Sequence, residues 1–406
     1  MATNKEQNKL NVPHLRFPEF QGEWEKCKVS DLLDFYSTNS LSWDQLEYGT
    51  DNLLNLHYGL IHVGLPTMVD LSKDILPAIK KENEPKNFEL CKEGDIAFAD
   101  ASEDTNEVAK AIEFYTLEDK AVVCGLHTIH GRDKSNKTVV GYKGYAFSST
   151  AFHHQIRRIA QGTKIYSISA KNFAECYIGI PSKEEQTKIA KLLRLIDERI
   201  ATQSKLIEKL ESLIKGIVDC TILRKEKNAI VGDVCSISEQ IRAEANIDDI
   251  ITVRLHGNGV CKSSAENLQL GATQYYRRRA GQLIYGKQNF HNGAIGIVPI
   301  SLDNGITSKD IPSFDIDEMK CNSVYLLAQL QSPQYYKPAE ALTTGTGSKR
   351  LKEETFLKMP IVLPNKREQD NIAVLIHRAS MNLDHAKRLL ELLSIQKQFL
   401  LRQMFI

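Results

Sequence analysis

The stretch from Pro181 to about Ile222 constrains the fold of this chain more than any other part of it. Its apolar residues recur at alternating steps of four and three, and this 3.5-residue period is typical of a helix that pairs with a second helix. Ser182 and Glu185 match the Ser-x-x-Glu capping box, in which each side chain binds the backbone N–H of the other residue. The sequence therefore predicts one long amphipathic helix over residues 181–222 that needs a partner helix.

The partner helix is in the same chain, because the pattern returns 183 residues later (364 − 181 = 183). Pro364–Gln369 repeats Pro181–Gln186, with Asn365 as the cap, and Phe356 upstream corresponds to Phe173. Two copies with the same phase indicate an internal duplication. We therefore expect a second long helix over residues 364–406. The apolar residues expected to form the seam between the two helices are Ile189, Leu193, Ile196, Ile200, Ile207, Leu210 and Ile214 in the first helix and Ile372, Ile376, Leu383, Leu390 and Leu393 in the second.

The two long helices divide the rest of the chain into two modules. Residues 1–11 are polar and are expected to be a disordered leader, residues 12–180 form the first module and residues 223–363 form the second. Val231-Gly232-Asp233 repeats Val29-Ser30-Asp31 at a separation of 202, so the first module is longer by about 19 residues (202 − 183). The predicted fold class is α+β, with two mixed α/β modules separated by a long antiparallel two-helix coiled coil and related by a pseudo-two-fold internal repeat.

Connectivity decides the direction of the two helices. The first module joins the start of the first helix, and the second module joins both the end of the first helix and the start of the second. The second helix must therefore begin near the end of the first and run back beside it. We expect an antiparallel pair with one module at each end, which is a dumbbell.

The composition is that of a globular chain: 42% of the residues are hydrophobic, 25% are charged and the formal net charge is +1. No apolar run approaches the length of a membrane span, and the first residues, Met1-Ala2-Thr3-Asn4-Lys5, have no signal-peptide core. The eight cysteines include no Cys-x-x-Cys pair, which argues against zinc ribbons and disulfide scaffolds. We expect a cytoplasmic protein with reduced thiols.

A stiff helical pair that separates two similar modules matches the dyad symmetry of duplex DNA. In this interpretation each module reads a short base sequence and the helices set the gap between the two readings. The near-neutral net charge implies that binding would depend on local basic patches.

Several stretches, taken together and in order, carry a family resemblance. They are the leader Val12–Phe20 followed by Trp24, a Gly-Thr turn in each module, the paired Pro…Glu-Gln helix starts, and Gly293–Pro299 in the second module. With these stretches the chain resembles, over nearly its whole length, the specificity subunit of type I restriction–modification systems.

The resemblance implies two target-recognition domains, each of which binds one half of a bipartite sequence in double-stranded DNA. It implies two modification subunits that dock on the helical regions and use S-adenosylmethionine to methylate adenine at N6. It also implies restriction subunits that need ATP and Mg²⁺ to translocate and cleave DNA. In this family the specificity subunit itself catalyses nothing, so no cofactor is expected in this chain.

The residues agree with an absence of catalytic chemistry. The chain has no Pro-Pro pair, so the Asn/Asp-Pro-Pro-aromatic motif of adenine methyltransferases is missing. Gly281–Gln288 nearly matches a phosphate-binding loop, but Gln288 lacks the hydroxyl that would bind magnesium and the interior is typical of a strand. His127 and His130, like His153 and His154, have no evident set of Cys or carboxylate partners, so no metal site is expected.

The candidate DNA-binding residues are basic, amide or glycine-rich, because such groups contact bases and phosphates. In the first module they are Arg157, Arg158, Gly162, Thr163, Lys164 and Tyr166. In the second module they are Arg277, Arg278, Arg279, Lys287, Gln288, Asn289, Gly345, Thr346, Gly347, Ser348, Lys349 and Arg350. The ordinary alternative for a basic triplet is a solvated strand end.

Two other classes of function compete with DNA reading. The chain could be a non-catalytic coiled-coil scaffold whose globular ends bind proteins, and the near-neutral charge leaves this interpretation open. A stand-alone nuclease or NTPase is the third class, and the missing motifs argue against it.

Overall fold

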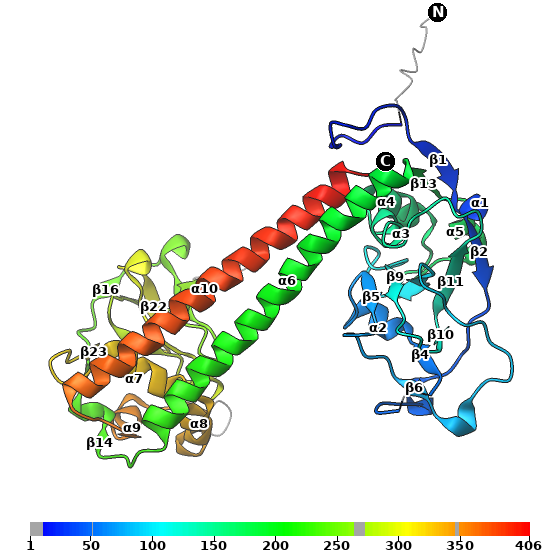
Figure 1. Ribbon diagram of the computed structural model, residues 1–406. Helices are drawn as coiled ribbons and strands as arrows, with labels where there is room; N and C mark the ends of the chain where they lie inside the picture. Colours follow the sequence, from blue (N-terminus) through cyan, green and yellow to red (C-terminus); the bar gives the residue numbers. More distant parts are fainter. Residues whose placement is uncertain (1–10, 51, 264–272, 346–348) are drawn as a thin grey trace, which may run out of the picture. The chain divides into compact units, whose positions relative to one another are not determined.

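The computed structural model describes residues 11–50, 52–263, 273–345 and 349–406 and divides the chain into two compact units. The first unit comprises the residues up to 203 together with 389–406, and the second comprises residues 204–388. Each unit contains one module and one end of the helix pair (Figure 1). The expected disordered leader lies, except for Asn11, outside the described residues.

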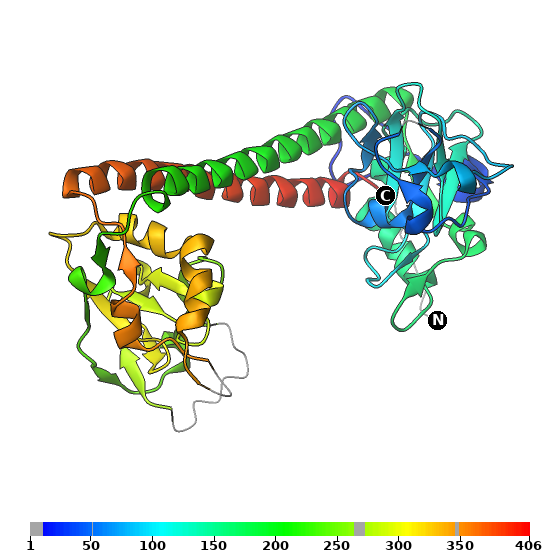
Figure 2. The same ribbon diagram turned by 90° about the horizontal axis from the view of Figure 1, so that it is seen from below.

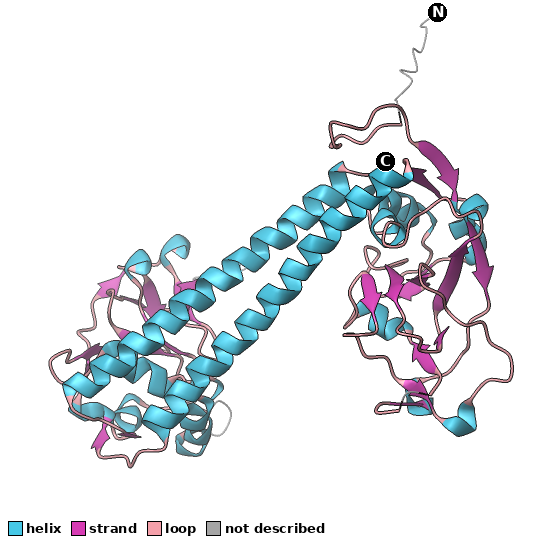
Figure 3. Cartoon of the chain, in the orientation of Figure 1, coloured by secondary structure: helices cyan, strands magenta, loops and turns pink. Residues whose placement is uncertain are grey.

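The two long helices form where the sequence predicts them. Helix α6 spans Lys183–Val218 and continues as a π-helical stretch over Asp219–Leu223, and helix α10 spans Lys366–Gln403. Figure 3 shows both segments as unbroken helices, whereas the strands lie in the modules.

The predicted capping box is only half formed at each helix start. The Glu185 N–H donates to Ser182 Oγ at 3.3 Å, but the Glu185 carboxylate accepts two bonds of 2.7 Å from the Arg16 guanidinium instead of reaching back. The carboxylate of Glu368 pairs in the same way with Lys225. Both acids therefore bind a cation from outside the helix, because an ion pair with hydrogen bonds is stronger than a bond to a neutral N–H.

The helix ends pack antiparallel within each unit, as predicted. In the first unit Ile189 and Leu193, near the start of α6, share a core with Leu400 and Met404, near the end of α10. Figures 1 and 2 both show these two ends side by side. The Lys397 ammonium also lies 2.6 Å from the Asp197 carboxylate.

The second unit has the complementary arrangement. Val218 and Ile222, at the end of the first long helix, share a core with Ile372 and Ile376 of α10. The dumbbell arrangement of the two modules stays a prediction.

Every predicted seam residue is buried or half-buried. Ile189, Leu193, Ile196, Ile372, Ile376 and Leu393 are buried, and Ile200, Ile207, Leu210, Ile214, Leu383 and Leu390 are half-buried. Apolar residues next to the seam behave differently: Leu206, Leu213, Leu389 and Leu392 are 44–62% exposed. The 3.5-residue period thus separates packed leucines from exposed ones on helices that contain both.

The first module is built on two sheets. The five-stranded sheet has the order β2-β11-β7-β9-β5, namely Leu33–Tyr36, Thr128–Asp133, Ile96–Ala99, Ala111–Thr116 and Met68–Asp70. The four-stranded sheet has the order β10-β4-β6-β3, namely Val122–Cys124, Leu54–Leu56, Ala78–Ile79 and Leu46–Glu47. The two-stranded pairs are β1 (Glu25–Lys28) with β13 (Tyr177–Ile180) and β8 (Ala101–Ser102) with β12 (Tyr166–Ser167). The helices are α1 (Val29–Leu32), α2 (Tyr58–His62), α3 (Lys143–Phe147), α4 (Thr150–Ile159) and α5 (Ala170–Ala174).

The second module repeats the main sheet in shorter form. Its order β15-β23-β20-β21 comprises Cys235–Ile237, Ser313–Ile316, Leu283–Tyr285 and Ile295–Ile297. A three-stranded sheet β16-β19-β22 comprises Arg242–Ala243, Tyr275–Arg277 and Ile306–Ser308. The pairs are β17 (Ile251–Val253) with β18 (Val260–Lys262) and β14 (Ala229–Ile230) with β24 (Pro360–Ile361). The helices are α7 (Ser323–Leu330), α8 (Pro333–Tyr336) and α9 (Glu353–Leu357).

Strand register bears out both repeat distances. In the first module Cys27 pairs with Ile178, and in the second Ala229 pairs with Ile361. These partners are related by 202 (229 − 27) and 183 (361 − 178), the two separations seen in the sequence. Phe173 and Phe356, one repeat apart, are both fully buried in aromatic clusters. The modules are therefore two copies of one fold that share the order of four sheet strands.

Candidate nucleic-acid interface

A tight loop after α4 holds the Gly-Thr turn of the first module. Gln161 and Ser167 pair across its base, with N–H to O distances of 2.9 and 2.8 Å. Gly162 has φ +135°, and a Cβ on it would lie 1.9 Å from the Ile165 carbonyl oxygen. The position therefore requires glycine, because any side chain would collide with backbone.

The second module repeats this loop at the expected distance. Thr344 and Arg350 pair with N–H to O distances of 3.0 and 2.9 Å, and Gly345 has φ +126°. These positions lie 183 residues after Gln161, Ser167 and Gly162. Thr346, Gly347 and Ser348 lie outside the described residues. In both modules the described ends of this loop are joined by the same antiparallel bridge.

In the first module the turn is exposed. Gly162, Thr163 and Lys164 are exposed, and Tyr166 is half-buried because it pairs with Ser102 in β8. Ile165, in the same turn, is 62% exposed.

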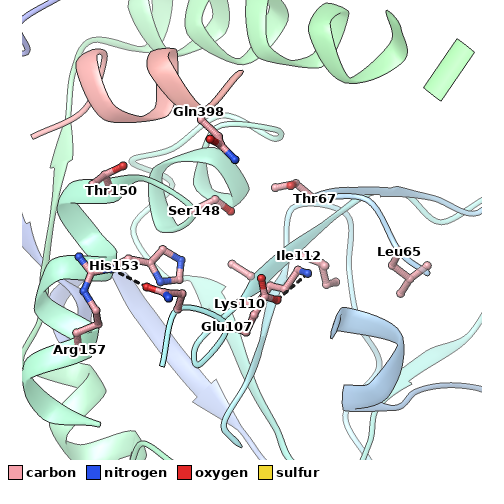
Figure 4. A pocket seen from close by; sticks show the side chains of 12 residues that line it. Leu65, Thr67, Glu107, Lys110, Ile112, Ser148, Thr150, His153, Arg157 and Gln398 are labelled. Carbon is pink, nitrogen blue, oxygen red and sulfur yellow. Dashed lines mark hydrogen bonds and ion pairs between the residues drawn. The ribbon is translucent and has the colours of Figure 1, made fainter. Parts of the chain in front are cut away.

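Arg157 and Arg158 lie in the last turn of α4 and are exposed. Their charge complements the negative end of the helix dipole, which is a structural reason for two arginines there. Arg157 donates to Asn106 Oδ1 at 3.2 Å and lies 2.7 Å from His154 Nδ1. It also lines a cavity of about 390 Å³ with Lys110, Glu107 and the half-buried His153 (Figure 4).

The loop also borders a second cavity, which the sequence did not indicate. Ile165 lines a space of about 620 Å³ together with Tyr58, His62 and His127. The rings of Tyr58 and His127 meet edge to face at 5.3 Å between centroids. Acidic residues lie in the same wall: Glu103, Asp104 and Glu107. This face of the first module is therefore aromatic and mixed in charge rather than uniformly basic.

In the second module two candidate segments meet at one edge. The Lys287 N–H donates to the Asp310 carbonyl oxygen, and the Lys287 carbonyl accepts from the Leu351 N–H, both at 2.9 Å. The Arg350 guanidinium lies 3.2 Å from the Asp310 carboxylate, and Lys349 lies 3.3 Å from Glu340. The structure thus brings the turn at residues 287–289 beside residues 350–351, at the described end of the Gly-Thr loop.

The residues of this edge differ in how accessible their side chains are to a DNA ligand. Gln288 and Asn289 are exposed. The ion pairs of Lys349 and Arg350 are exposed, so they cost little to exchange for phosphate. Lys287 is only 12% exposed and lies 2.7 Å from the Glu353 carboxylate, so it is held inward by a charge partner.

The prediction of a basic triplet is wrong at its centre. Arg277 and Arg279 are exposed, but the side chain of Arg278 is fully buried. Strand β19 ends at Arg277, and the side chain of the next residue, Arg278, is turned into the module, where it is held by hydrogen bonds. Arg278 Nε donates to Thr307 Oγ1 at 2.7 Å, and its Nη atoms donate to Ser313 Oγ at 2.9 Å and to the Ile311 carbonyl at 3.0 Å.

Burial lowers the pKa of Arg278 to about 10, so the guanidinium is still charged at neutral pH. Its hydrogen bonds fasten the segment that follows Asp310, the residue that pairs with Arg350. Arg278 therefore positions the candidate edge without facing solvent.

The structure also bears on the expectations about phosphate binding and metal binding. The near-match to a phosphate-binding loop contains strand β20, Leu283–Tyr285, which is buried as a strand interior would be. The expectation that the histidines lack partners is wrong for His130. Cys91, Cys124 and His130 come together, with one ligand atom of each within 4.8 Å of the others. This group could not be recognised in the sequence, because the two cysteines are 33 residues apart.

Comparisons with known proteins agree with this architecture. Residues 115–212 match the family model of the type I restriction modification DNA specificity domain. The fold is similar to that of a type I restriction-modification S subunit from M. genitalium, with a TM-score of 0.60, 14% identity, and 97% of this chain and 99% of that chain covered. It is also similar to a chain from a structure that describes complex assembly and conformational transition of the type I R-M system. The TM-score there is 0.52 at 12% identity, and 96% of this chain and 98% of that chain are covered.

No protein of curated function matches the sequence. Among the helices of the described residues, none combines the length and the apolar content needed to cross a membrane.

Proposed function

We propose that the chain is a DNA specificity subunit of a type I restriction–modification system and that each of its two modules reads one half of a bipartite site in duplex DNA. The family-model match over residues 115–212 and the similarity of the fold support this proposal. The resemblance to this family implies a subunit without catalytic activity. Methylation of adenine N6 with S-adenosylmethionine is accordingly assigned to two modification subunits. ATP- and Mg²⁺-dependent translocation and cleavage are assigned to restriction subunits.

The repeated turn is the observation that carries the proposal. Gly162 and Gly345 occupy the same strained turn in the two copies, and each turn is followed by basic residues. A glycine turn lets backbone N–H groups approach phosphates closely, while Lys164, Lys349 and Arg350 add positive charge. Phosphate contacts of this kind set the register of the module on the duplex, and the groove-facing side chains then select the bases.

The second module has the clearer set of base-reading candidates. Gln288 and Asn289 are exposed beside Arg350, and amide side chains can make paired bonds to adenine. In the first module the aromatic wall around Tyr58 would contact sugars and bases, with Lys164 and Arg158 on phosphates. The acidic residues of that wall would reject phosphates that enter at the wrong position.

We assign the spacing of the half-sites and the docking of the modification subunits to the helix pair. α6 is continuous over 36 residues, which corresponds to about 54 Å at ~1.5 Å per residue. Exposed leucines beside the seam, such as Leu213 and Leu392, supply apolar surface for a partner subunit.

Binding of the reconstituted methyltransferase complex to DNA tests the function. Methylome sequencing of cells that carry the complex would return the bipartite site, and a fluorescent duplex containing it would then be titrated at several salt concentrations. We expect tight binding that needs both half-sites and weakens steeply with salt. Equal affinity for duplexes with one or both halves scrambled would refute half-site reading.

The spacing role has a separate test. Insertion of one heptad into both α6 and α10 at matching positions adds about 10 Å, or roughly three base pairs, to the spacer. The preferred gap between half-sites is expected to lengthen accordingly. A variant that binds normally with the original gap would contradict the spacer role while leaving half-site reading intact.

A further inference from the structure

Three buried residues of the first module form an unexplained cluster. Cys124 ends strand β10, His130 lies in the middle of β11, and Cys91 lies in the segment before β7. All three are buried and are far from the Gly-Thr turn in the sequence. Strands β10 and β11 are labelled in Figure 1. The cluster has no role in the proposed reading of DNA.

The distances within the cluster fit metal ligands. Cys91 Sγ lies 3.6 Å from Cys124 Sγ, and one ring nitrogen of His130 lies within 4.8 Å of both sulfur atoms. Zn–S bonds of about 2.3 Å at tetrahedral angles place two sulfur ligands about 3.8 Å apart. A disulfide would require about 2.05 Å, and both cysteines are free thiols. The sulfur pair therefore already has the separation of a zinc-bound pair.

The imidazole of His130 is prepared as a ligand. Its Nε2 lies 2.8 Å from Asp95 Oδ2, and its buried Nδ1 has no hydrogen-bond partner among the described residues. A buried polar atom without a partner is costly, so its retention calls for a ligand. Metal-binding histidines characteristically bond a carboxylate through the second ring nitrogen, which orients the ring.

Asp95 is itself fixed in place. Its carboxylate accepts 2.9 and 2.8 Å bonds from the Arg132 guanidinium and a 2.9 Å bond from the Lys92 N–H. The carboxylate therefore has little freedom to move away from His130. This is the outer-shell support that a preorganised metal site needs.

We propose that Cys91, Cys124 and His130 form a binding site for a soft divalent cation of the Zn²⁺ class, held by two thiolates and the Nδ1 atom of a neutral imidazole. Two thiolates cancel the charge of the cation, so the occupied site is neutral overall and compatible with full burial.

A bound cation would also have a structural effect on the module. Binding would release both thiol protons and link three segments of the sheet framework. The site therefore serves the stability of the first module and is independent of the DNA-reading proposal.

Metal analysis of the full-length chain tests the proposal. Protein purified under reducing conditions would be reconstituted with Zn²⁺ or Co²⁺, passed over a chelating resin, and measured by mass spectrometry of the metal and by absorption. We expect one cation per chain and, for Co²⁺, the charge-transfer absorption of thiolate ligands. This absorption reports cysteine ligation in the unmodified protein, so the test does not depend on a variant that folds.

Substitutions then identify the ligands. C91S and C124S are each expected to abolish stoichiometric binding, whereas C176S, which alters a buried cysteine of the same unit, leaves it unchanged. H130A is expected to lose binding and H153A, at a half-buried histidine whose Nδ1 is also buried and unpartnered among the described residues, to retain it. D95N is expected to weaken affinity about 10- to 100-fold.

Three results would overturn the site. The first is that no stoichiometric cation remains after reconstitution, and the second is that the Co²⁺ spectrum lacks thiolate absorption. The third is that the protein purified under reducing conditions contains a Cys91–Cys124 disulfide. Retention of the cation by both C91S and C124S would have the same meaning.

Discussion

Gln186 and Gln369, 183 residues apart (369 − 186), make the same three hydrogen bonds in the two units. Each amide nitrogen donates to the proline carbonyl before its helix and to a lysine carbonyl in the module, and each amide oxygen accepts from the N–H two residues after that lysine. The distances are 2.9, 3.0 and 2.9 Å for Gln186 with Pro181, Lys137 and Val139, and 2.8, 3.1 and 2.8 Å for Gln369 with Pro364, Lys320 and Asn322. Both side chains are buried, so this glutamine joins each long helix to its module.

Replacement of Gln186 or Gln369 by Ala is therefore expected to destabilise the unit that contains it. Each substitution leaves three backbone groups without a partner, and we expect a loss of about 2–3 kcal/mol in the free energy of unfolding. Urea unfolding of the full-length chain measures the loss, and hydrogen exchange at residues 137–139 or 320–322 locates it. Q396A, at an exposed position of α10, is the control. Equal stability of Q186A and Q396A would contradict the role of the buried amide.

The arginine triplet is expected to separate into two phenotypes. R278A removes the partner of Thr307, Ser313 and the Ile311 carbonyl, and it should cost about 3 kcal/mol of stability. R277A and R279A should leave the unfolding free energy within about 0.5 kcal/mol, since both side chains are exposed. Chemical denaturation of the three variants measures these differences in the free energy of unfolding. The assignment of Arg278 to the interior fails if R278A is as stable as R277A.

The loop of the second module is expected to contribute phosphate contacts. K349A/R350A should weaken binding of the complex to its DNA chiefly through one half-site and lower the slope of log K against log salt by about 2, roughly 0.9 per lost contact. Titration at several salt concentrations gives the slope. K349A/R350A would then be compared with K358A, at a lysine on the following segment. An unchanged slope for the loop variant would exclude the loop from the interface.

Stability of the first unit is expected to fall on mild acidification because of His153. Burial lowers the pKa of His153, with a further effect of Arg157 and an opposing one of Glu107, and the imidazole therefore stays neutral in the folded chain. In the unfolded chain a histidine takes up its proton below about pH 6.5. Protonation thus favours unfolding, and stability decreases as the pH falls through that value.

Urea unfolding at pH 7.5 and 5.5 measures this effect. H153Q should show a smaller decrease than the native sequence, whereas H154Q, at the exposed neighbour on α4, should show the full decrease. The same pH response in H153Q and the native sequence would assign the titration to other groups.

Much of the candidate interface depends on facts that a linear sequence does not contain. Lys287 and Arg350 belong to one edge because backbone bonds join Lys287 to Leu351 and to Asp310, and no spacing rule relates these positions. Arg278 differs from its two exposed neighbours because its side chain is buried against Thr307 and Ser313. The turns at Gly162 and Gly345, by contrast, were predictable, because a repeated glycine at a repeated place indicates a backbone requirement rather than a chance residue.

The sequence by itself determined the duplication, the two long helices and their seam, because phase and period are local properties that survive divergence and need no knowledge of the fold. Only the tertiary structure decided which polar residues face solvent and which distant ones meet. Cys91, Cys124 and His130 converge because strand pairing and an irregular segment bring them together. Such long-range contacts arise from sheet register and burial, which depend on the whole module at once.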